Sequence, residues 1–274
     1  MPHVDFHLHT TTSDGVWTPQ EMFAFLRESG IEMFSITDHD TMDIYPLPED
    51  LAAKSVTGME VDTKCEGATS HLLVYGIRTA SAPLLRRLQA QRKARRGRME
   101  AIVEKLQKAG IGVTMADVEA QAGAAQSLGR PHLARALVTL GIVPDVQTAF
   151  DRYIADDKDG FVSLERLDSA EAITLAHESG AVVSVAHPKR LKEPRLLDVL
   201  RSEGADGIEV VHPSADDTAR LEFHKYAAEH GMLVTGGTDF HAPSPGYRPG
   251  ITSLNSDDVS RFLDAVGKAS AYLG

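Results

Sequence analysis

A series of short apolar runs that alternates with helical segments is the feature that most constrains the fold of this chain. The runs cover residues 4–8, 33–37, 55–61, 71–77, 181–187, 207–212 and 232–241. After the first run, "TPQEMFAFLRESG" predicts a helix with N-cap Thr18, a capping box completed by Glu21, and an end at Gly30. Alternating strands and helices favour parallel pairing and an α/β fold, and seven such units can close into an irregular barrel.

The region from 82 to 160 interrupts this pattern. It contains helical stretches and no convincing strand, so we expect a helical insertion at 82–160 that caps a barrel built from residues 1–81 and 161–274. The first helix of this region is strongly basic. Basic side chains on one face of a helix usually contact only water, although part of this face could instead attract phosphate. The basic residues of its first helix are Arg86, Arg87, Arg92, Lys93, Arg95, Arg96 and Arg98.

Side chains that can bind metals gather where the predicted strands end. His7 and His9 lie on one face of the first run, which for an isolated pair is equally typical of a solvated strand. The C-terminal ends of parallel barrel strands form one mouth, so a whole set of such residues should meet there. His71 begins its run, so either its strand is antiparallel or it belongs to the preceding loop. The remaining residues of this set are Asp14, Asp38, His39, Glu60, His187, Asp239 and His241.

The composition limits the functions that the chain can have. With 274 residues and 42% hydrophobic content, it can bury a large core. The single cysteine, Cys65, excludes an intrachain disulfide, and no run approaches the ~20 apolar residues of a membrane span. We therefore expect a cytoplasmic protein with no membrane contact and no obligate protein partner. A net charge of −11 argues against a broad nucleic-acid-binding surface but permits a small anionic substrate beside bound cations.

Six motifs occur in order along nearly the whole chain: "DFHLHTTTSDG", "ITDHDT", "GMEV", "SHLLVYG", "VAHP" and "TDFHA". Together they resemble the PHP family of metallophosphoesterases, named for polymerase and histidinol phosphatase domains, within the amidohydrolase superfamily. With "GRPHLARAL" in the insertion, the chain is similar to the bacterial 3′,5′-nucleotide bisphosphate phosphatase group of that family. The resemblance implies a distorted seven-stranded (β/α)7 TIM-like barrel with a trinuclear metal centre.

The resemblance also implies which residues bind the three divalent metal ions. Glu60 would bridge two of the ions, and Asp14 stands where some family members have histidine. Mixed imidazole and carboxylate ligands suit Mn²⁺, Fe²⁺ or Zn²⁺, and we expect Mn²⁺. Asp5, Asp38 and Asp40 would orient ligand imidazoles. The three ligand groups would be His7, His9, Glu60 and Asp239; Glu60, His71 and His187; and Asp14, His39 and His241.

Four further residues are candidate substrate contacts. The guanidinium of Arg130 matches phosphate geometry, and His132 follows Pro131 at a predicted helix start, where an anion is favoured. Their alternative roles are a surface cap and a first-turn residue, and the resemblance favours phosphate. Lys158 is another candidate, and His212 could protonate the leaving oxygen.

These features predict a phosphoric monoester hydrolase in which Glu60, Asp239 and His212 are catalytic. Paired metals lower the pKa of a bridging water and neutralise phosphate oxygens. We expect the substrate to resemble adenosine 3′,5′-bisphosphate, with release of the 3′-phosphate. The alternatives are a 5′-to-3′ exonuclease on short oligonucleotides, a non-catalytic metal-binding PHP module, and a carbon–nitrogen hydrolase.

Overall fold

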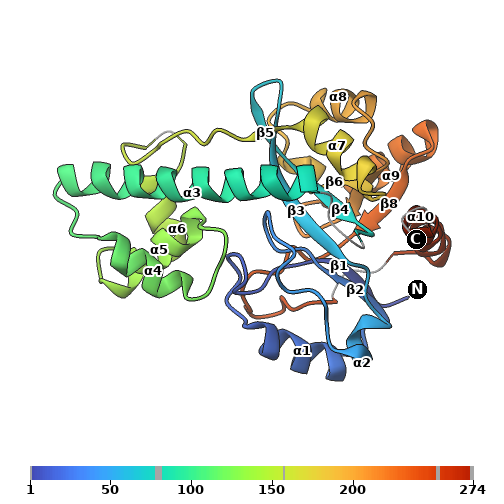
Figure 1. Ribbon diagram of the computed structural model, residues 1–274, viewed down its shortest axis with the longest axis horizontal. Coiled ribbons are helices and arrows are strands. Elements are labelled where there is room, and N and C mark those ends of the chain that lie inside the picture. The colour runs from blue at the N-terminus through green and yellow to red at the C-terminus, as the bar shows by residue number, and fades with distance from the viewer. Residues whose placement is uncertain (1, 78–81, 157, 251–253, 272–274) are drawn as a thin grey trace.

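The computed structural model describes residues 2–77, 82–156, 158–250 and 254–271, and it is an α/β fold from which a group of helices projects (Figure 1). The strands are β1 Val4–Leu8, β2 Met33–Ile36, β3 Gly58–Cys65, β4 Ala68–Tyr75, β5 Leu167–Asp168, β6 Val182–Val185, β7 Gly207–Val211 and β8 Leu233–Gly236. The α-helices are α1 Pro19–Glu28, α2 Glu49–Ala52, α3 Ala82–Lys108, α4 Met115–Ala122, α5 Arg130–Thr139, α6 Val146–Ala149, α7 Ser169–Glu178, α8 Leu196–Ser202, α9 Asp217–His230 and α10 Ser256–Ala271. The π-helix η1 covers Phe150–Ile154 and the 3-10 helix η2 covers Pro188–Arg190.

The strands form a mixed arrangement, not an all-parallel one. Hydrogen bonds join β1 to β2 in one sheet and order the other as β5-β3-β4-β6-β7-β8. The α/β class is confirmed, but the predicted parallel pairing is wrong for β4, which runs antiparallel to both β3 and β6. The cause is a tight hairpin, in which Glu66 and Gly67 take positive φ and return the chain at once. The antiparallel alternative for His71 is therefore confirmed.

Isolated β-bridges connect the two sheets near the strand ends. Leu8 pairs with Phe240, and His39 pairs with Glu60, both in parallel. These single bridges do not establish a closed barrel, but they bring the ends of β1, β2, β3 and β8 together. The strand ends that carry most of the predicted ligands thus lie side by side.

The hairpin corrects one detail of the predicted strands. β3 and β4 are eight residues each and extend past the predicted runs 55–61 and 71–77 toward the hairpin turn. Glu60 is therefore the third residue of its strand and does not end it. Glu60 still lies near the end of β2, because β2 stops at Ile36 and His39, three residues later, pairs with Glu60.

The helix α3 joins two hydrophobic cores (Figure 1). Its N-terminal residues Leu84 and Leu88 pack in the core around the six-stranded sheet. Farther along, Met99 and Ile102 pack in a separate core with residues of α4, α5 and η1. We call the elements from α3 to η1, residues 82–154, the helical unit; the predicted boundary at residue 81 lies outside the described residues. No helix in the described part of the chain is long and apolar enough to cross a bilayer.

The helix α1 is formed as its sequence predicts. Thr18 accepts a hydrogen bond from the backbone N–H of Glu21, and the Glu21 carboxylate accepts from the backbone N–H of Thr18. This capping box fixes the helix start, and Gly30 follows the helix end with φ +70°. Met22 and Leu26 are buried against β1 and β2 residues. The helix therefore supports the strand that carries the first two histidines.

Candidate metal centre

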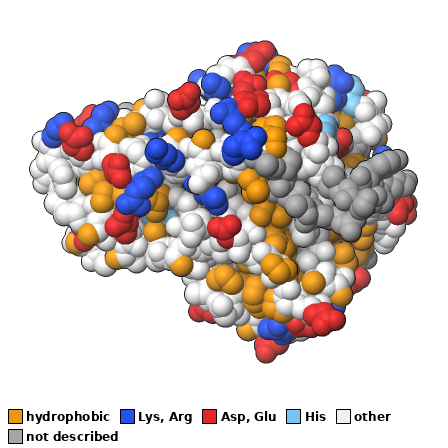
Figure 2. Space-filling view, in the orientation of Figure 1, with side chains coloured by type: hydrophobic (Ala, Val, Ile, Leu, Met, Phe, Trp, Pro, Cys, Tyr) orange, Lys and Arg blue, Asp and Glu red, His pale blue; other side chains and the backbone are white. Residues whose placement is uncertain are grey.

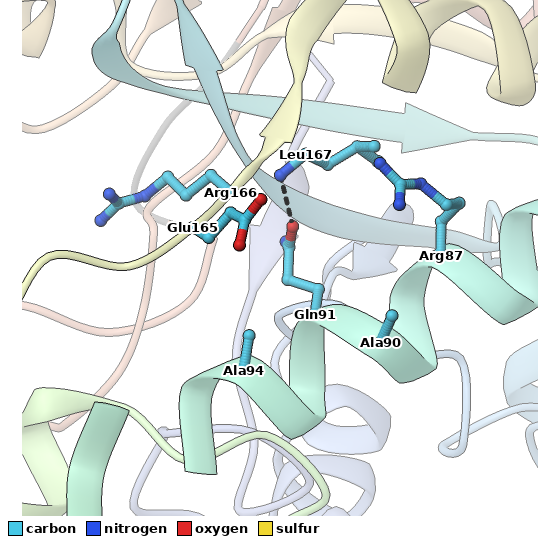
Figure 3. A pocket seen from close by; sticks show the side chains of 7 residues that line it. All are labelled: Arg87, Ala90, Gln91, Ala94, Glu165, Arg166 and Leu167. Atoms are coloured by element: carbon cyan, nitrogen blue, oxygen red, sulfur yellow. Dashed lines mark hydrogen bonds between the residues drawn. The ribbon is translucent and has the colours of Figure 1, made fainter. Parts of the chain in front are cut away.

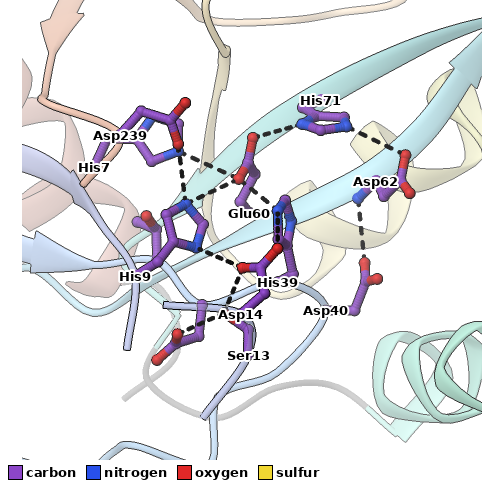
Figure 4. A network of polar contacts seen from close by, with 12 residues as sticks. His7, His9, Ser13, Asp14, His39, Asp40, Glu60, Asp62, His71 and Asp239 are labelled. Atoms are coloured by element: carbon purple, nitrogen blue, oxygen red, sulfur yellow. Dashed lines mark hydrogen bonds and ion pairs between the residues drawn. The ribbon is translucent and has the colours of Figure 1, made fainter. Parts of the chain in front are cut away.

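All nine predicted metal ligands lie in one cluster, within β1, β3 and β4 or in the loops that follow β1, β2, β6 and β8. Figure 4 shows seven of them pointing toward one another from β1, β3, β4 and the loops that follow β1, β2 and β8. Three groups of side chains are close enough to hold a cation: His7, His9, Glu60 and Asp239; His9, Asp14, His39 and His241; and His39, Glu60 and His71.

Glu60 lies at the middle of the cluster, and its two carboxylate oxygens face different histidines. The Oε2 atom is 3.3 Å from His7 Nε2 and 3.2 Å from His9 Nε2. The Oε1 atom is 2.7 Å from His71 Nδ1 and 3.0 Å from His187 Nε2. His39 Nδ1 also lies 3.3 Å from Oε2, so the two oxygens face different sets of imidazoles, as a carboxylate shared between two ions would.

Asp14 and His241 form the outer part of the cluster. Asp14 Oδ1 is 3.3 Å from His241 Nε2, and Asp14 Oδ2 is 4.0 Å from His39 Nε2. The other ring nitrogen of His39 is 3.3 Å from Glu60 Oε2. His39 therefore faces both the Asp14 group and Glu60, whereas the sequence assigned it to the Asp14 group alone.

The two carboxylate oxygens of Asp239 have different neighbours. Its Oδ1 atom is 3.3 Å from both His7 Nε2 and His9 Nε2. Its Oδ2 atom accepts a 2.7 Å hydrogen bond from Arg190 and lies 3.4 Å from His212 Nε2. Sequence reasoning missed Arg190, although it follows the "VAHP" motif by two residues.

The chemistry of the donor atoms fits divalent transition metals. The buried atoms His7 Nε2, His9 Nε2, His39 Nδ1 and Glu60 Oε2 have no hydrogen-bond partner among the described residues. Buried polar atoms are rarely left unpaired unless an ion or water completes them. Ligands bound at about 2.1 Å in tetrahedral geometry lie roughly 3.4 Å apart, close to the spacing of these atoms. The lone pairs thus converge as metal ligands do.

The electrostatics of the cluster also favour cations. Burial opposes protonation of His9, but the nearby carboxylates of Asp239 and Glu60 outweigh it and raise the pKa of His9 to about 10. Burial would raise the pKa of Glu60, but the surrounding imidazoles hold it well below its usual value. The pKa of Asp239 is lowered in the same way. The carboxylates therefore stay ionised and attract positive charge, whether protons or metal ions.

Unusual backbone conformations place several of these side chains. Asp40, His187 and Asp239 have φ of 55°, 29° and 52°, a region that costs a non-glycine residue energy. Such strain persists where the surrounding structure imposes it, as at functional sites. Gly237 allows the chain before Asp239 to approach β1, because a Cβ there would lie 2.4 Å from the Cβ of His7.

Glu209 of β7 orients the ring of His7 and was missed by the sequence analysis. Its Oε1 atom is 2.9 Å from His7 Nδ1, and its Oε2 atom accepts a 2.6 Å hydrogen bond from the backbone N–H of His187. A carboxylate on one imidazole nitrogen leaves the other free to bind a metal. The signal was available, because Glu209 is an acidic residue inside the apolar run "GIEVVH".

The three aspartates predicted to orient imidazoles have other hydrogen-bond partners. Asp5 accepts from Thr238 and from the backbone N–H of Gly250, so it holds the segment before Asp239. Asp38 accepts from Thr10 and Ser13 and holds the loop that carries Asp14. Asp40 pairs with Arg95 of α3. They position ligand-bearing loops, and no hydrogen bond joins them to the rings of the nine predicted ligands.

The predicted substrate contacts lie at the start of α5 and beside the cluster. Arg130 donates to Ile154 O at 3.1 Å and to Asp156 at 2.6 Å, and so holds the segment that continues to the half-buried Lys158. His132 is buried, and its Nδ1 atom accepts a 3.0 Å hydrogen bond from the backbone N–H of Gly129. That contact caps the helix, as the alternative reading expects, and a phosphate contact for His132 stays a prediction.

His212 lies inside the cluster with a defined orientation. The backbone N–H of Ser214 donates to His212 Nδ1 at 2.9 Å. The hydrogen of the neutral ring is therefore on Nε2, the atom that faces Asp239. When the ring is protonated, its second hydrogen is on Nδ1, which lies 2.7 Å from Ser214 Oγ, and Nε2 is then the atom that can release a proton at the mouth of the site.

Arginines from several elements surround the same region. Burial and the neighbouring guanidinium groups of Arg130, Arg166 and Arg95 lower the pKa of Arg98 to about 10. Arg98 donates to Val162 O at 2.7 Å. Arg130 is paired with Asp156, and Arg95 and Arg166 are paired with Asp62, so part of this positive charge is already neutralised by carboxylates.

Known proteins resemble the chain over most of its length. A 5′-3′ exoribonuclease of Haemophilus influenzae is 33% identical over 249 residues, which is 87% of this chain and 90% of that protein. A 3′,5′-nucleoside bisphosphate phosphatase of Chromobacterium violaceum is 31% identical over 260 residues, 90% of each chain. A solved structure from Bifidobacterium adolescentis, assigned as a metal-dependent phosphoesterase, superposes with a TM-score of 0.86 at 28% identity and covers 96% of both chains. No protein-family model matches the chain.

Proposed function

Because the chain belongs to the PHP family of metal-dependent phosphoesterases, we propose that it hydrolyses the 3′-phosphate of nucleoside 3′,5′-bisphosphates. The products are the 5′-monophosphate and inorganic phosphate. The observation that carries the proposal is the position of Glu60, whose two carboxylate oxygens face different sets of imidazoles.

The nine clustered side chains are the proposed ligands of three divalent ions, with Mn²⁺ as the expected metal. When bound, the ions supply an activated water and neutralise the phosphate oxygens. A new P–O bond then forms from water while the bond from phosphorus to the 3′-oxygen breaks. The protonated ring of His212, with its Nδ1–H toward Ser214 Oγ, is the proposed donor of the proton that the leaving oxygen takes from Nε2. The strand ends around the centre are, in this proposal, the mouth of a distorted seven-stranded barrel.

The helical unit is the proposed cap that recognises the second phosphate. Arg130 and Arg98 supply guanidinium groups, and Lys158 and His132 lie on the adjacent segments. The remote phosphate held there orients the reacting group over the metals.

A 5′-to-3′ exoribonuclease activity is the second candidate. It is favoured by the activity of the Haemophilus influenzae relative and by a basic cleft of about 560 Å³ between α3 and α4. Arg92, Lys93 and Arg96 line this cleft, and Figure 2 shows basic side chains gathered over the same helices. The cleft could follow a phosphate backbone beyond the first nucleotide.

One experiment tests both candidates. Protein loaded with Mn²⁺ is analysed for metal and assayed for phosphate release from adenosine 3′,5′-bisphosphate, for mononucleotide release from a 5′-phosphorylated oligoribonucleotide, and for ring opening of cyclic amides. We expect more than one metal per chain and the highest kcat/KM on the bisphosphate. At most one metal per chain would count against the trinuclear centre, and absence of all turnover would favour a non-catalytic module.

A further inference from the structure

A buried guanidinium from the helical unit lies behind the metal centre. Arg95 of α3 is 8% exposed. Its Nε atom donates to Asp40 Oδ2 at 2.7 Å, and its Nη2 atom donates to Asp62 Oδ2 at 2.9 Å. Neither carboxylate belongs to the proposed metal ligands, but each adjoins one of them.

Asp62 connects Arg95 to a ligand ring. The other oxygen of Asp62, Oδ1, lies 3.4 Å from His71 Nε2 and accepts a 2.6 Å hydrogen bond from Arg166. The opposite ring nitrogen, His71 Nδ1, is 2.7 Å from Glu60 Oε1. A carboxylate beside Nε2 keeps the hydrogen on that atom and leaves the lone pair of Nδ1 facing the metal position. Figure 4 shows this row from Asp62 through His71 to Glu60.

Asp40 connects Arg95 to the segment that carries His39. Its backbone N–H donates to Glu60 O at 2.9 Å, and its Oδ1 atom accepts from the backbone N–H of Asp62 at 3.2 Å. The same Oδ1 atom accepts a 2.7 Å hydrogen bond from Gln91, one turn before Arg95 on α3. Gln91 also accepts from the backbone N–H of Leu167, as Figure 3 shows. Gln91 and Arg95 of α3 thus hold, by hydrogen bonds to Asp40 and Asp62, the segments that carry His39 and Glu60.

We propose that Arg95 is a positioning residue that sets the metal affinity of the Glu60–His71–His187 position through Asp62. The inference rests on the proposed metal centre but not on the identity of the substrate. Without the guanidinium, Asp40 and Asp62 are neighbouring buried carboxylates that repel each other, and Asp62 loses the bond that holds its second oxygen toward His71. In this proposal the helical unit has two roles: it covers the metal centre, and it supplies Arg95, which holds Asp62 beside the ligand His71.

The test measures metal binding directly. Metal-free full-length protein is titrated with Mn²⁺ by equilibrium dialysis and elemental analysis, for wild type, Arg95→Met, Arg95→Lys, Asp62→Asn and the double variant Arg95→Met/Asp62→Asn. Changes to the surroundings of a metal ligand cost about 10- to 100-fold in affinity, so we expect one equivalent to bind at least about tenfold more weakly in Arg95→Met. Arg95→Lys should lose less, because an ammonium can still pair with one carboxylate. The double variant should match Asp62→Asn.

The matched control is Arg96→Met, which removes the same charge from the neighbouring position, where the side chain pairs with the exposed Glu119 and Glu100. It should bind metal as wild type does. Equal metal affinity in folded Arg95→Met and wild type, or an equal loss in Arg96→Met, would overturn the proposal. If Arg95→Met does not fold, unchanged affinity in both Arg95→Lys and Asp62→Asn overturns it instead. A changed metal affinity in a protein that fails to release phosphate would refute the proposed function alone.

Discussion

The Nδ1 atom of His7 lies 2.9 Å from Oε1 of Glu209, and both side chains are fully buried. This pairing keeps the hydrogen of the His7 ring on Nδ1 and aims Nε2 at Glu60 and Asp239. Glu209→Gln removes the charge but keeps the shape, so we expect metal affinity to fall by about 10- to 100-fold. Elemental analysis after dialysis measures the loss. Glu229→Gln, at an exposed position on α9, is the control and should retain all metal.

Glu60→Gln should affect two metal positions at once. An amide has one acceptor oxygen, so it cannot offer an anionic oxygen to both pairs of imidazoles. We expect loss of more than one equivalent of metal and a fall in kcat far larger than any rise in KM. Metal content and steady-state kinetics are measured on the same preparation, with Glu66→Gln from the β3–β4 turn as control. Near-normal turnover would contradict the bridging role.

Arg130→Ala should reduce the preference for substrates with two phosphates. A lost charge-assisted hydrogen-bond pair costs about 3 kcal/mol, which is on the order of a hundredfold in kcat/KM. We expect that loss for adenosine 3′,5′-bisphosphate and almost no change for 3′-AMP. Arg152→Ala, at an exposed position in η1, is the control. If Arg130→Ala slows both substrates equally, Arg130 does not contact the remote phosphate.

His212→Asn should slow substrates that need a proton on the leaving oxygen. General acid catalysis contributes about 10²- to 10⁴-fold, so kcat for a nucleoside 3′-phosphate should fall within that range. The nitrophenolate of a nitrophenyl phosphate leaves without needing a proton, so kcat for that ester should fall much less. The ratio of the two rates, measured at saturating substrate, is the readout. An equal fall for both esters would assign His212 to metal or phosphate binding.

His177→Gln should destabilise the fold in a pH-dependent way. His177 Nε2 is 2.8 Å from Asp206 Oδ2, and this hydrogen bond raises the pKa of His177 above its usual value although partial burial opposes the change. A raised pKa in the folded state stabilises the protein below the unfolded pKa, and the contribution disappears as pH rises through the folded pKa. Urea unfolding should therefore show a larger loss at pH 5.5 than at pH 8.5. Equal losses would assign the effect to packing.

Local patterns and the family resemblance pointed to the side chains that cluster in the structure, but not to the residues that surround them. His7 and His9 were identifiable because alternation in a strand puts them on one face, and Thr18 and Glu21 predicted a helix start that depends only on nearby residues. The direction of β4 was left open, because it depends on the turn at Glu66 and Gly67, which only pairing with β3 reveals. Arg95 and Arg190 were missed as site residues because their partners lie far away in sequence. Long-range ion pairs leave no periodic signal along the chain.

Because α3 is one continuous helix, it fixes the spacing between Arg95 and Arg98, which the proposed function places near the two phosphates of the substrate. Arg95 is fixed behind the metal centre, and Arg98 lies three residues farther along the same helix, among the guanidinium groups. In an α-helix three residues correspond to about 4.5 Å along the axis, and one added residue turns all later side chains by about 100°. In the proposed function, helical geometry therefore sets the distance between the reacting and the remote phosphate, and insertion of a single residue between positions 95 and 98 would turn Arg98 away while leaving Arg95 in place.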